Sequence, residues 1–337
     1  MIKHFPCYYI PTPAELKELF DTSYFVFDTN VLLDIYRLGP DYSAKVLQLI
    51  KYYSNRVKIP YHVAEEYHDN LVPTLVDHIE KLKKAIGQLD FTKFSSTVSN
   101  YLKDNLPNTI INEFTNRLKY SLKRFQRTLQ NQQDFLNNEL SECTLQRQLS
   151  ELLSPLLLEP FTEAEIATIE DEGLTRYQSA VPPGYKDAKK TSNTYGDLII
   201  WKEIIKFAQA NNTSVIFISR DVKEDWFYEL HGRKLGPRIE LLKEFHQNVP
   251  SKYFYIYTMD TFIRYANEHI VGDKLFSEQE IDSVTDMLSE VHKNNNQLYK
   301  NETCKSVAKF PKMGKVELKA KGTEDIKMSS SEKKIKA

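Results

Sequence analysis

The segment Tyr24-Phe-Val-Phe-Asp28-Thr-Asn30 decides the fold class of this chain. A short run of large apolar residues that ends in Asp-Thr-Asn is typical of a buried strand followed at once by a helix. Three further apolar runs predict strands at residues 57–60, 214–219 and 253–257. Helices are predicted at 31–37, 42–53, 196–210 and 258–269, and another begins after Pro60. Strands that alternate with helices predict an α/β fold with a central parallel sheet.

Residues 61–213 contain no further strand-like segment and carry two apolar stripes at helical spacing. The first stripe is Leu75, Ile79, Leu82, Ile86 and Leu89, and the second is Leu118, Leu122, Phe125, Leu129 and Leu136. We expect a large insertion of long, coiled-coil-like helices that pack as an antiparallel hairpin, with Phe125 in the core. Dimerisation through the same stripes is the alternative.

These patterns divide the chain into four parts. Residues 1–75 and 181–292 are expected to form the two halves of the α/β domain, the second with the C-terminal helices. Residues 76–180 are expected to form the helical insertion. Residues 293–337 hold 12 Lys, five acidic residues and few large apolar residues, so we expect a disordered tail.

Glycine and cysteine positions exclude several classes of function. The ten glycines form neither G-x-G-x-x-G nor G-x-x-x-x-G-K-[ST], which excludes Rossmann dehydrogenases, glycine-loop kinases and P-loop NTPases. Cys7, Cys143 and Cys304 are too far apart for zinc-ligand pairs and too few for a disulfide framework. No apolar run approaches the roughly 18 residues of a membrane span, and the N-terminus lacks a signal-peptide core. We therefore expect a cytoplasmic protein without a membrane partner.

Two acidic residues follow predicted strands. Asp28 ends the first strand and Asp221 follows the third, and the carboxyl ends of parallel strands border the binding crevice of an open sheet. The alternative is that each caps the helix that follows it. Asn30 is placed to cap the first helix itself, which would leave Asp28 without that structural duty.

Helical phase selects two more acidic residues. Glu66 lies about 60° from Val63 on a helical wheel, whereas Glu65 lies about 160° away and faces water. Asn70, one turn beyond Glu66, is expected on the same face. Asp197 lies one turn before Trp201 on the inner edge of its helix. Its alternative role is to interact with the helix dipole.

Four carboxylates directed at one crevice would repel each other without a cation. Asp28, Glu66, Asp197 and Asp221 are therefore candidate ligands of Mg²⁺ or Mn²⁺, which prefer carboxylate oxygens. A site of this kind positions a phosphodiester and generates a hydroxide for hydrolysis.

The motifs around these residues resemble the PIN-like nuclease family. They are Phe27-Asp28-Thr-Asn30-Val-Leu-Leu, Ile59-Pro60-Tyr-His-Val-Ala-Glu-Glu66-Tyr, Gly196-Asp197-Leu-Ile-Ile-Trp and Ile218-Ser-Arg-Asp221. Pro182-Pro-Gly-Tyr-Lys-Asp187 and Lys223-Glu-Asp-Trp226 look like the bacterial PIN-like branch with a long helical insertion. The resemblance covers about residues 20–75 and 180–270 and implies a three-layer PIN-like fold.

The resemblance also implies an activity and roles for individual residues. It implies divalent-metal-dependent cleavage of RNA, or of DNA in some branches, and a bacterial defence or toxin setting. Asp28, Glu66, Asp197 and Asp221 would be the metal-binding acids, with Asp225 as an accessory ligand. Asn30 would orient these groups and the substrate. Glu65 remains the alternative to Glu66 as the ligand.

Several cations adjoin the candidate acids and are expected to contact substrate phosphates. Lys186 is the first candidate because Gly184 frees the loop before it, and Arg220 and Lys223 flank Asp221. Asp187 is an accessory candidate in the same loop. Residues 114–133 contain five basic residues and no acid. This helix is expected either to bind nucleic acid or to pair with the acidic run at residues 163–172.

These observations favour a metal-dependent PIN-like endonuclease, most simply an endoribonuclease in a defence or toxin-like setting. A structure-specific DNA nuclease and a non-catalytic coiled-coil scaffold are the alternatives. The expected partner is nucleic acid, RNA rather than DNA. The helical insertion is a candidate surface for a homodimer or another protein.

Overall fold

The computed structural model describes residues 1, 5–89, 91–102, 104–220, 223–231 and 233–288. Two sequence predictions lie outside these residues: the position of Asp221 and the disordered tail at 293–337.

A four-stranded parallel sheet forms the centre of the α/β domain. Its strands are β1 (Tyr24–Phe27), β2 (Val57–Lys58), β3 (Val215–Ile218) and β6 (Phe254–Tyr257), in the order β2-β1-β3-β6. Phe27 is paired with Ile218 in the parallel register, so β1 and β3 end at the same edge. All four residues of β3 are buried, as expected for a strand covered on both faces. The predicted parallel α/β sheet is confirmed.

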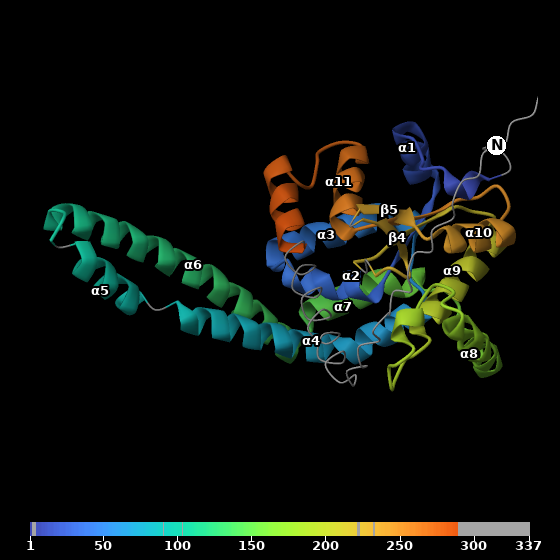
Figure 1. The fold of residues 1–337 in the computed structure, drawn as a ribbon, viewed down its shortest axis with the longest axis horizontal. Helices are drawn as coiled ribbons and strands as arrows, with labels where there is room; N and C mark the ends of the chain where they lie inside the picture. The colour runs from blue at the N-terminus through green and yellow to red at the C-terminus, as the bar shows by residue number, and fades with distance from the viewer. Residues whose placement is uncertain (2–4, 90, 103, 221–222, 232, 289–337) are drawn as a thin grey trace, which may run out of the picture. The chain divides into compact units, whose positions relative to one another are not determined.

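Helices cover both faces of this sheet (Figure 1). One group contains α1 (Pro13–Thr22), α3 (Pro40–Tyr52) and α11 (Met259–His269), and Phe262 of α11 packs against Phe25 and Phe27. The other contains α9 (Gly196–Asn211) and α10 (Ile239–Asn248), and Trp201 of α9 packs against Phe254. The short helix α2 (Thr29–Asp34) follows β1 directly. The expected three-layer arrangement is confirmed.

Long helices form the insertion between β2 and β3. They are α4 (Tyr61–Gln88), α5 (Phe91–Leu102), α6 (Asn108–Glu142), α7 (Thr144–Leu153) and α8 (Glu163–Gln178). α4 and α5 lead outward and α6 returns beside them (Figure 1). Leu75, Ile79, Leu82 and Leu136 are buried along this contact. The two stripes thus pack against each other within one chain, as the hairpin prediction required. Helix α4 continues without a break through residue 75, where the helical insertion was expected to begin.

The prediction for Phe125 is wrong, because 52% of this residue is exposed. The physical reason is that the helix packed against α6 changes near this position, from α4 to α5. Gln126 donates from Nε2 to the Leu89 carbonyl at 3.0 Å, so the break between α4 and α5 lies beside this turn. A helix end offers no continuous groove for the large Phe125 side chain.

Several elements were not predicted. An antiparallel hairpin of β4 (Phe227–Leu230) and β5 (Arg233–Pro237) follows β3. A final helix covers 278–288, in the part of the chain where C-terminal helices were expected. Short 3-10 helices span Pro6–Tyr8, Ile35–Arg37, Ser54–Arg56, Ser154–Leu156 and Tyr185–Asp187. Among the described residues, no helix has the length and apolar character to cross a membrane.

An ion-pair network fixes α8 against α9 and α10. Arg176 of α8 contacts both carboxylate oxygens of Glu244 at 2.8 Å, and Trp201 Nε1 donates to Glu244 at 3.0 Å. Lys202 of α9 contacts Glu172 at 2.8 Å and Glu244 at 3.2 Å. These contacts fix the position of α8 and therefore of the point where the loop from α8 to α9 begins.

Candidate active site

Asp28 lies at the carboxyl end of β1 and is buried. Its Oδ1 accepts the Thr29 backbone N–H at 2.8 Å, so it does cap α2. Its Oδ2 accepts from Asn30 Nδ2 at 2.6 Å and from Ser219 Oγ at 2.5 Å. Asp28 therefore caps α2, the alternative considered from the sequence, and Asn30 does not take that role.

Asn30 joins the ends of β1 and β3. Its amide nitrogen donates to Asp28, while its Oδ1 accepts the Arg220 backbone N–H at 2.8 Å. The Arg220 guanidinium turns away and contacts Asp34, which is fully buried in α2. Arg37 contacts the same Asp34 oxygen at 3.1 Å. Arg220, expected to bind phosphate, is therefore held in a buried ion-pair cluster.

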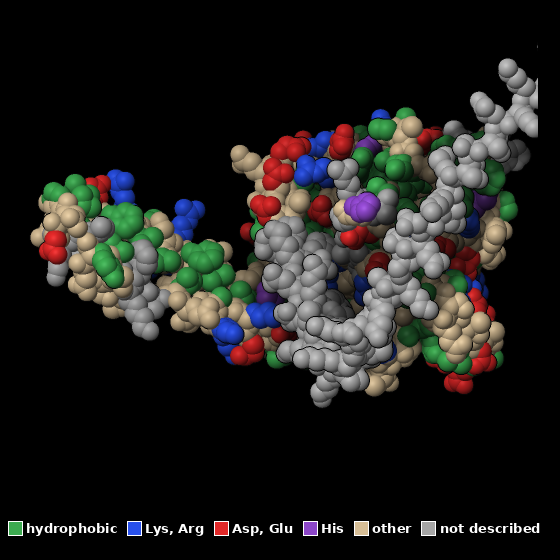
Figure 2. All heavy atoms as spheres, in the orientation of Figure 1, with side chains coloured by type: hydrophobic (Ala, Val, Ile, Leu, Met, Phe, Trp, Pro, Cys, Tyr) green, Lys and Arg blue, Asp and Glu red, His purple; other side chains and the backbone are tan. Residues whose placement is uncertain are grey.

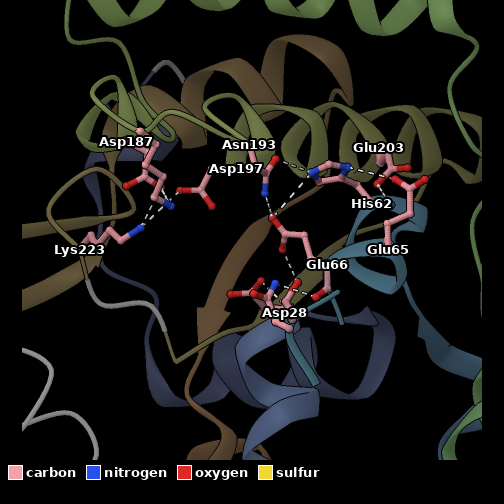
Figure 3. Close-up of polar contacts among 12 residues, drawn as sticks. Asp28, His62, Glu65, Glu66, Asp187, Asn193, Asp197, Glu203 and Lys223 are labelled. Atoms are coloured by element: carbon pink, nitrogen blue, oxygen red, sulfur yellow. Dashed lines mark hydrogen bonds and ion pairs between the residues drawn. The ribbon is translucent and has the colours of Figure 1, made fainter. Parts of the chain in front are cut away.

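Glu66 lies on the first turns of α4 and points toward Asp28 (Figure 3). Its Oε2 accepts from the Thr29 hydroxyl and its Oε1 from Asn193 Nδ2. Nε2 of His62 lies 3.7 Å from the same Oε1. Thr29 therefore connects the two carboxylates, since its N–H binds Asp28 and its hydroxyl binds Glu66.

Glu65 occupies a different environment from Glu66. Its side chain is 56% exposed, against 19% for Glu66, and its Oε2 lies 3.3 Å from His62 Nδ1. Asn70 donates to the Glu66 main-chain carbonyl at 2.7 Å, so its amide serves α4 itself. The helical phase expected from the sequence is the phase found.

Gly196 begins α9 at the point where Glu66 reaches it. A Cβ at this position would lie 2.8 Å from Glu66 Oε1 and 2.6 Å from the Asn193 amide atoms. These distances are shorter than normal van der Waals contacts. The absence of a side chain at residue 196 therefore lets the carboxylate approach the helix start.

Asp197 lies between the Glu66 group and a second polar group (Figure 3). Lys223 Nζ is 3.8 Å from Asp197 Oδ2 and 3.2 Å from Asp187 Oδ2. Asp225 is fully buried beneath the 185–187 turn, and its Oδ2 accepts the Lys186 backbone N–H at 3.4 Å. Burial raises the pKa of the nearby Tyr177 hydroxyl, and the charges of Asp197, Asp187 and Asp225 raise it further.

Lys186 lies at the edge of this second group. Its Nζ contacts Glu224, and this interaction raises the pKa of the ammonium group. Its side chain is exposed, as is that of Glu224. Lys223, by contrast, lies between the carboxylates of Asp187 and Asp197.

Four residues that contact the candidate acids were not predicted from the sequence: Thr29, Ser219, Asn193 and His62. Thr29 and Ser219 adjoin strand ends, and that position is a signal that could have found them. His62 lies one turn before Glu66, which is also readable from helical spacing. Asn193 lies in an irregular loop, where no periodicity points to it. His62 and Asn193 also line a hollow of about 340 Å³ together with Glu65 and Tyr195.

The donor chemistry of the crevice fits a hard divalent cation. Asp28 and Glu66 present carboxylate oxygens, and Thr29, Asn30 and Asn193 fix them with neutral donors. Such oxygens are the preferred ligands of Mg²⁺ and Mn²⁺. Within the described part of the chain, however, no three His, Cys, Asp or Glu side chains converge closely enough to hold a metal ion. Asp221 lies outside that part.

Comparison with known proteins identifies one family. A family model described as a PIN-like domain matches residues 24–241, which include strands β1, β2 and β3 and the helical insertion. No curated protein and no solved structure matches the chain.

Proposed function

Because this chain belongs to the PIN-like domain family, whose members are usually nucleases, we propose that it is a divalent-metal-dependent endonuclease that cleaves RNA. The family membership supports hydrolysis of phosphodiester bonds in general. The choice of metal, the preference for RNA and a bacterial defence or toxin-like setting are the finer parts of the proposal. Their support is the resemblance of the motifs around Asp28, Glu66 and Asp197.

The observation that carries the proposal is the pair of carboxylates joined by Thr29. Asp28 comes from the end of β1 and Glu66 from α4, yet one residue binds both. Two carboxylates held side by side repel each other, and a cation removes that cost. Asn30, Ser219 and Asn193 orient the oxygens before any ligand arrives.

In the proposed mechanism Asp28 and Glu66, which Thr29 joins, would hold the cation first, and Asp197, Asp221 and Asp225 would be further ligands that move toward it on binding. When bound, a divalent cation neutralises charge on the phosphate and lowers the pKa of a water molecule. Lys223 is 3.8 Å from Asp197 and would exchange this contact for a substrate phosphate. Asn30 and Asn193 would act by keeping the carboxylates in place. The exposed Lys186 would contact the flanking backbone.

A cleavage assay with labelled substrates tests the proposal. Single-stranded RNA, single-stranded DNA and a DNA flap would each be incubated with the full chain and Mg²⁺, Mn²⁺ or EDTA. We expect metal-dependent cuts in RNA, and loss of at least about 100-fold in rate for Asp28→Asn and Asp197→Asn. Preferential cutting of the flap would favour a structure-specific DNA nuclease instead. Cleavage by both variants at the wild-type rate would show that the site is misassigned.

A further inference from the structure

One face of α6 gathers basic side chains over about three helical turns. It consists of Arg117, Lys119, Tyr120, Lys123, Arg124 and Arg127, and we call it the α6 basic face. All six residues are exposed, and Tyr120 is 72% exposed. Figure 2 shows Lys and Arg side chains standing among hydrophobic ones on the outward part of this hairpin.

The α6 basic face lies opposite the side of the helix that packs. At 100° per residue, its members fall around the direction opposite Leu118 and Leu122. Those two leucines are partly buried, and Gln126 on their side bonds the Leu89 carbonyl. The orientation of the basic side chains is therefore fixed by the hairpin contact, and they point into solvent.

Most of this charge is not paired with carboxylates in the part of the chain that the structure describes. Arg117 pairs with Glu113 at 2.7 Å, but among the described residues no carboxylate pairs with Lys119, Lys123, Arg124 or Arg127. Two acidic residues of α8, the partner considered from the sequence, pair with other cations. Glu165 contacts Lys206 at 3.0 Å, and Glu172 contacts Arg176 and Lys202. Pairing between α6 and α8 is therefore not what the structure contains.

We propose that the α6 basic face binds the sugar–phosphate backbone of a nucleic acid as a site separate from the carboxylate crevice. Exposed cations without local carboxylates can neutralise phosphates, which releases the counterions condensed on the nucleic acid. The face is about 15 Å long, which is enough to contact successive phosphates of one strand. Tyr120 stands among the cations and offers a ring on which an unpaired base stacks. The ring favours single-stranded nucleic acid over a duplex.

This surface goes beyond the proposed function, because it adds a binding site for a strand that extends past the cleavage site. An acidic protein segment would satisfy the charges alone but would make no use of a stacking ring. A need for the Tyr120 ring in binding would therefore distinguish a nucleic acid from an acidic protein segment.

Binding is tested without cleavage, so that failure of the nuclease proposal does not affect the outcome. Fluorescent 30-nucleotide RNA is titrated with full-length protein in EDTA at several salt concentrations. The test variant changes Lys119, Lys123 and Arg127 to Gln. The matched control changes Lys81, Lys83 and Lys206 to Gln, which removes the same charge outside the α6 basic face, at exposed cations already paired with Asp77, Glu80 and Glu165.

The test variant is expected to weaken binding at least about 10-fold and to reduce the salt-dependence slope by about 2. The control variant is expected to change affinity less than about threefold. Tyr120→Ala is expected to weaken single-strand binding about 10-fold and duplex binding much less. Circular dichroism verifies that each variant keeps its helices. Equal losses in the test and control variants, or wild-type binding by the test variant, would overturn the proposal, as would a Tyr120→Ala variant that binds single strands normally.

Discussion

Asn193 donates its side-chain amide to the Glu66 carboxylate, across 127 residues of sequence. The same amide oxygen lies 3.0 Å from His62 Nε2, so Asn193 contacts two residues on the first turns of α4. The loop before α9 and the start of α4 are thereby joined at the carboxylate that we propose as a metal ligand. Asn193 is thus placed to fix the orientation of the Glu66 carboxylate, as residues that hydrogen-bond to a metal ligand commonly do.

Asn193→Ala is therefore expected to impair metal use more than substrate binding. Loss of such an orienting partner typically costs about 10–100-fold in metal affinity or activity. We expect the Mg²⁺ concentration for half-maximal cleavage to rise by about that factor, with KM for RNA little changed. Asn211→Ala is the control, since Asn211 donates only to the Phe207 carbonyl within its own helix. An unchanged Mg²⁺ dependence would remove Asn193 from the site.

The two adjacent glutamates of α4 provide a paired test. Glu66→Gln keeps the shape of a side chain that contacts Thr29 and Asn193 but removes its charge. We expect it to lower the cleavage rate at least about 100-fold. Glu65→Gln changes a side chain that is mostly exposed and is expected to change the rate less than about threefold. A reversed order of effects would make Glu65 the ligand and require α4 to rotate on binding metal.

Local sequence determined some of the site because strand ends and helical phase are local properties. The apolar run before Asp28 predicts where β1 stops, and the position of Val63 predicts which glutamate turns inward. Both predictions describe where backbone and side chain lie. The catalytic roles of these residues stay predictions.

Other features depend on partners that no local pattern encodes. Lys186 and Arg220 were expected at phosphates, but Glu224 and Asp34 contact them. The hairpin β4–β5 was missed because its second strand, Arg233-Lys-Leu-Gly-Pro237, lacks the apolar alternation that marks a half-buried strand. Phe125 fits the helical spacing of its stripe, yet the partner helix is interrupted beside it.

The ion pairs of Asp34 and Asp77 are expected to differ in their effect on stability. Asp34 is fully buried and contacts Arg220 and Arg37, so Asp34→Ala leaves two guanidinium groups without their carboxylate. We expect its free energy of unfolding to fall by about 3 kcal/mol. Asp77 and Lys81 are exposed, and Asp77→Ala is expected to cost less than about 0.5 kcal/mol. Urea unfolding monitored by circular dichroism measures both. Equal costs would show that burial does not govern these pairs.

Glu203 provides a pH-dependent test of the packing between α9 and α4. It is buried, and its carboxylate accepts the His62 backbone N–H at 3.3 Å at the start of α4, where no local side chain caps the helix. Burial raises the pKa of Glu203 to about 8, against the opposing effect of the backbone hydrogen bonds from His62 and Tyr61, and the neighbouring Glu65 charge adds to the increase.

The sign of the resulting pH dependence follows from proton binding. Between the ordinary pKa of 4.5 and the folded value of about 8, the folded chain binds more protons at Glu203 than the unfolded chain does. The free energy of unfolding should therefore fall as pH rises through this window. Glu203→Gln stays neutral and should remove that part of the decline.

We expect Glu203→Gln to match the wild type near pH 5 and to exceed its stability by on the order of 4 kcal/mol at pH 8.5. Urea titrations at pH 5, 7 and 8.5 measure the difference. Glu163→Gln on exposed α8 is the control and should follow the wild-type curve at every pH. If Glu203→Gln and the wild type lose stability in parallel up to pH 8.5, Glu203 is ionised in the folded protein throughout. Its carboxylate would then cap α4 as a charge, and the helix start that carries Glu66 would depend on it.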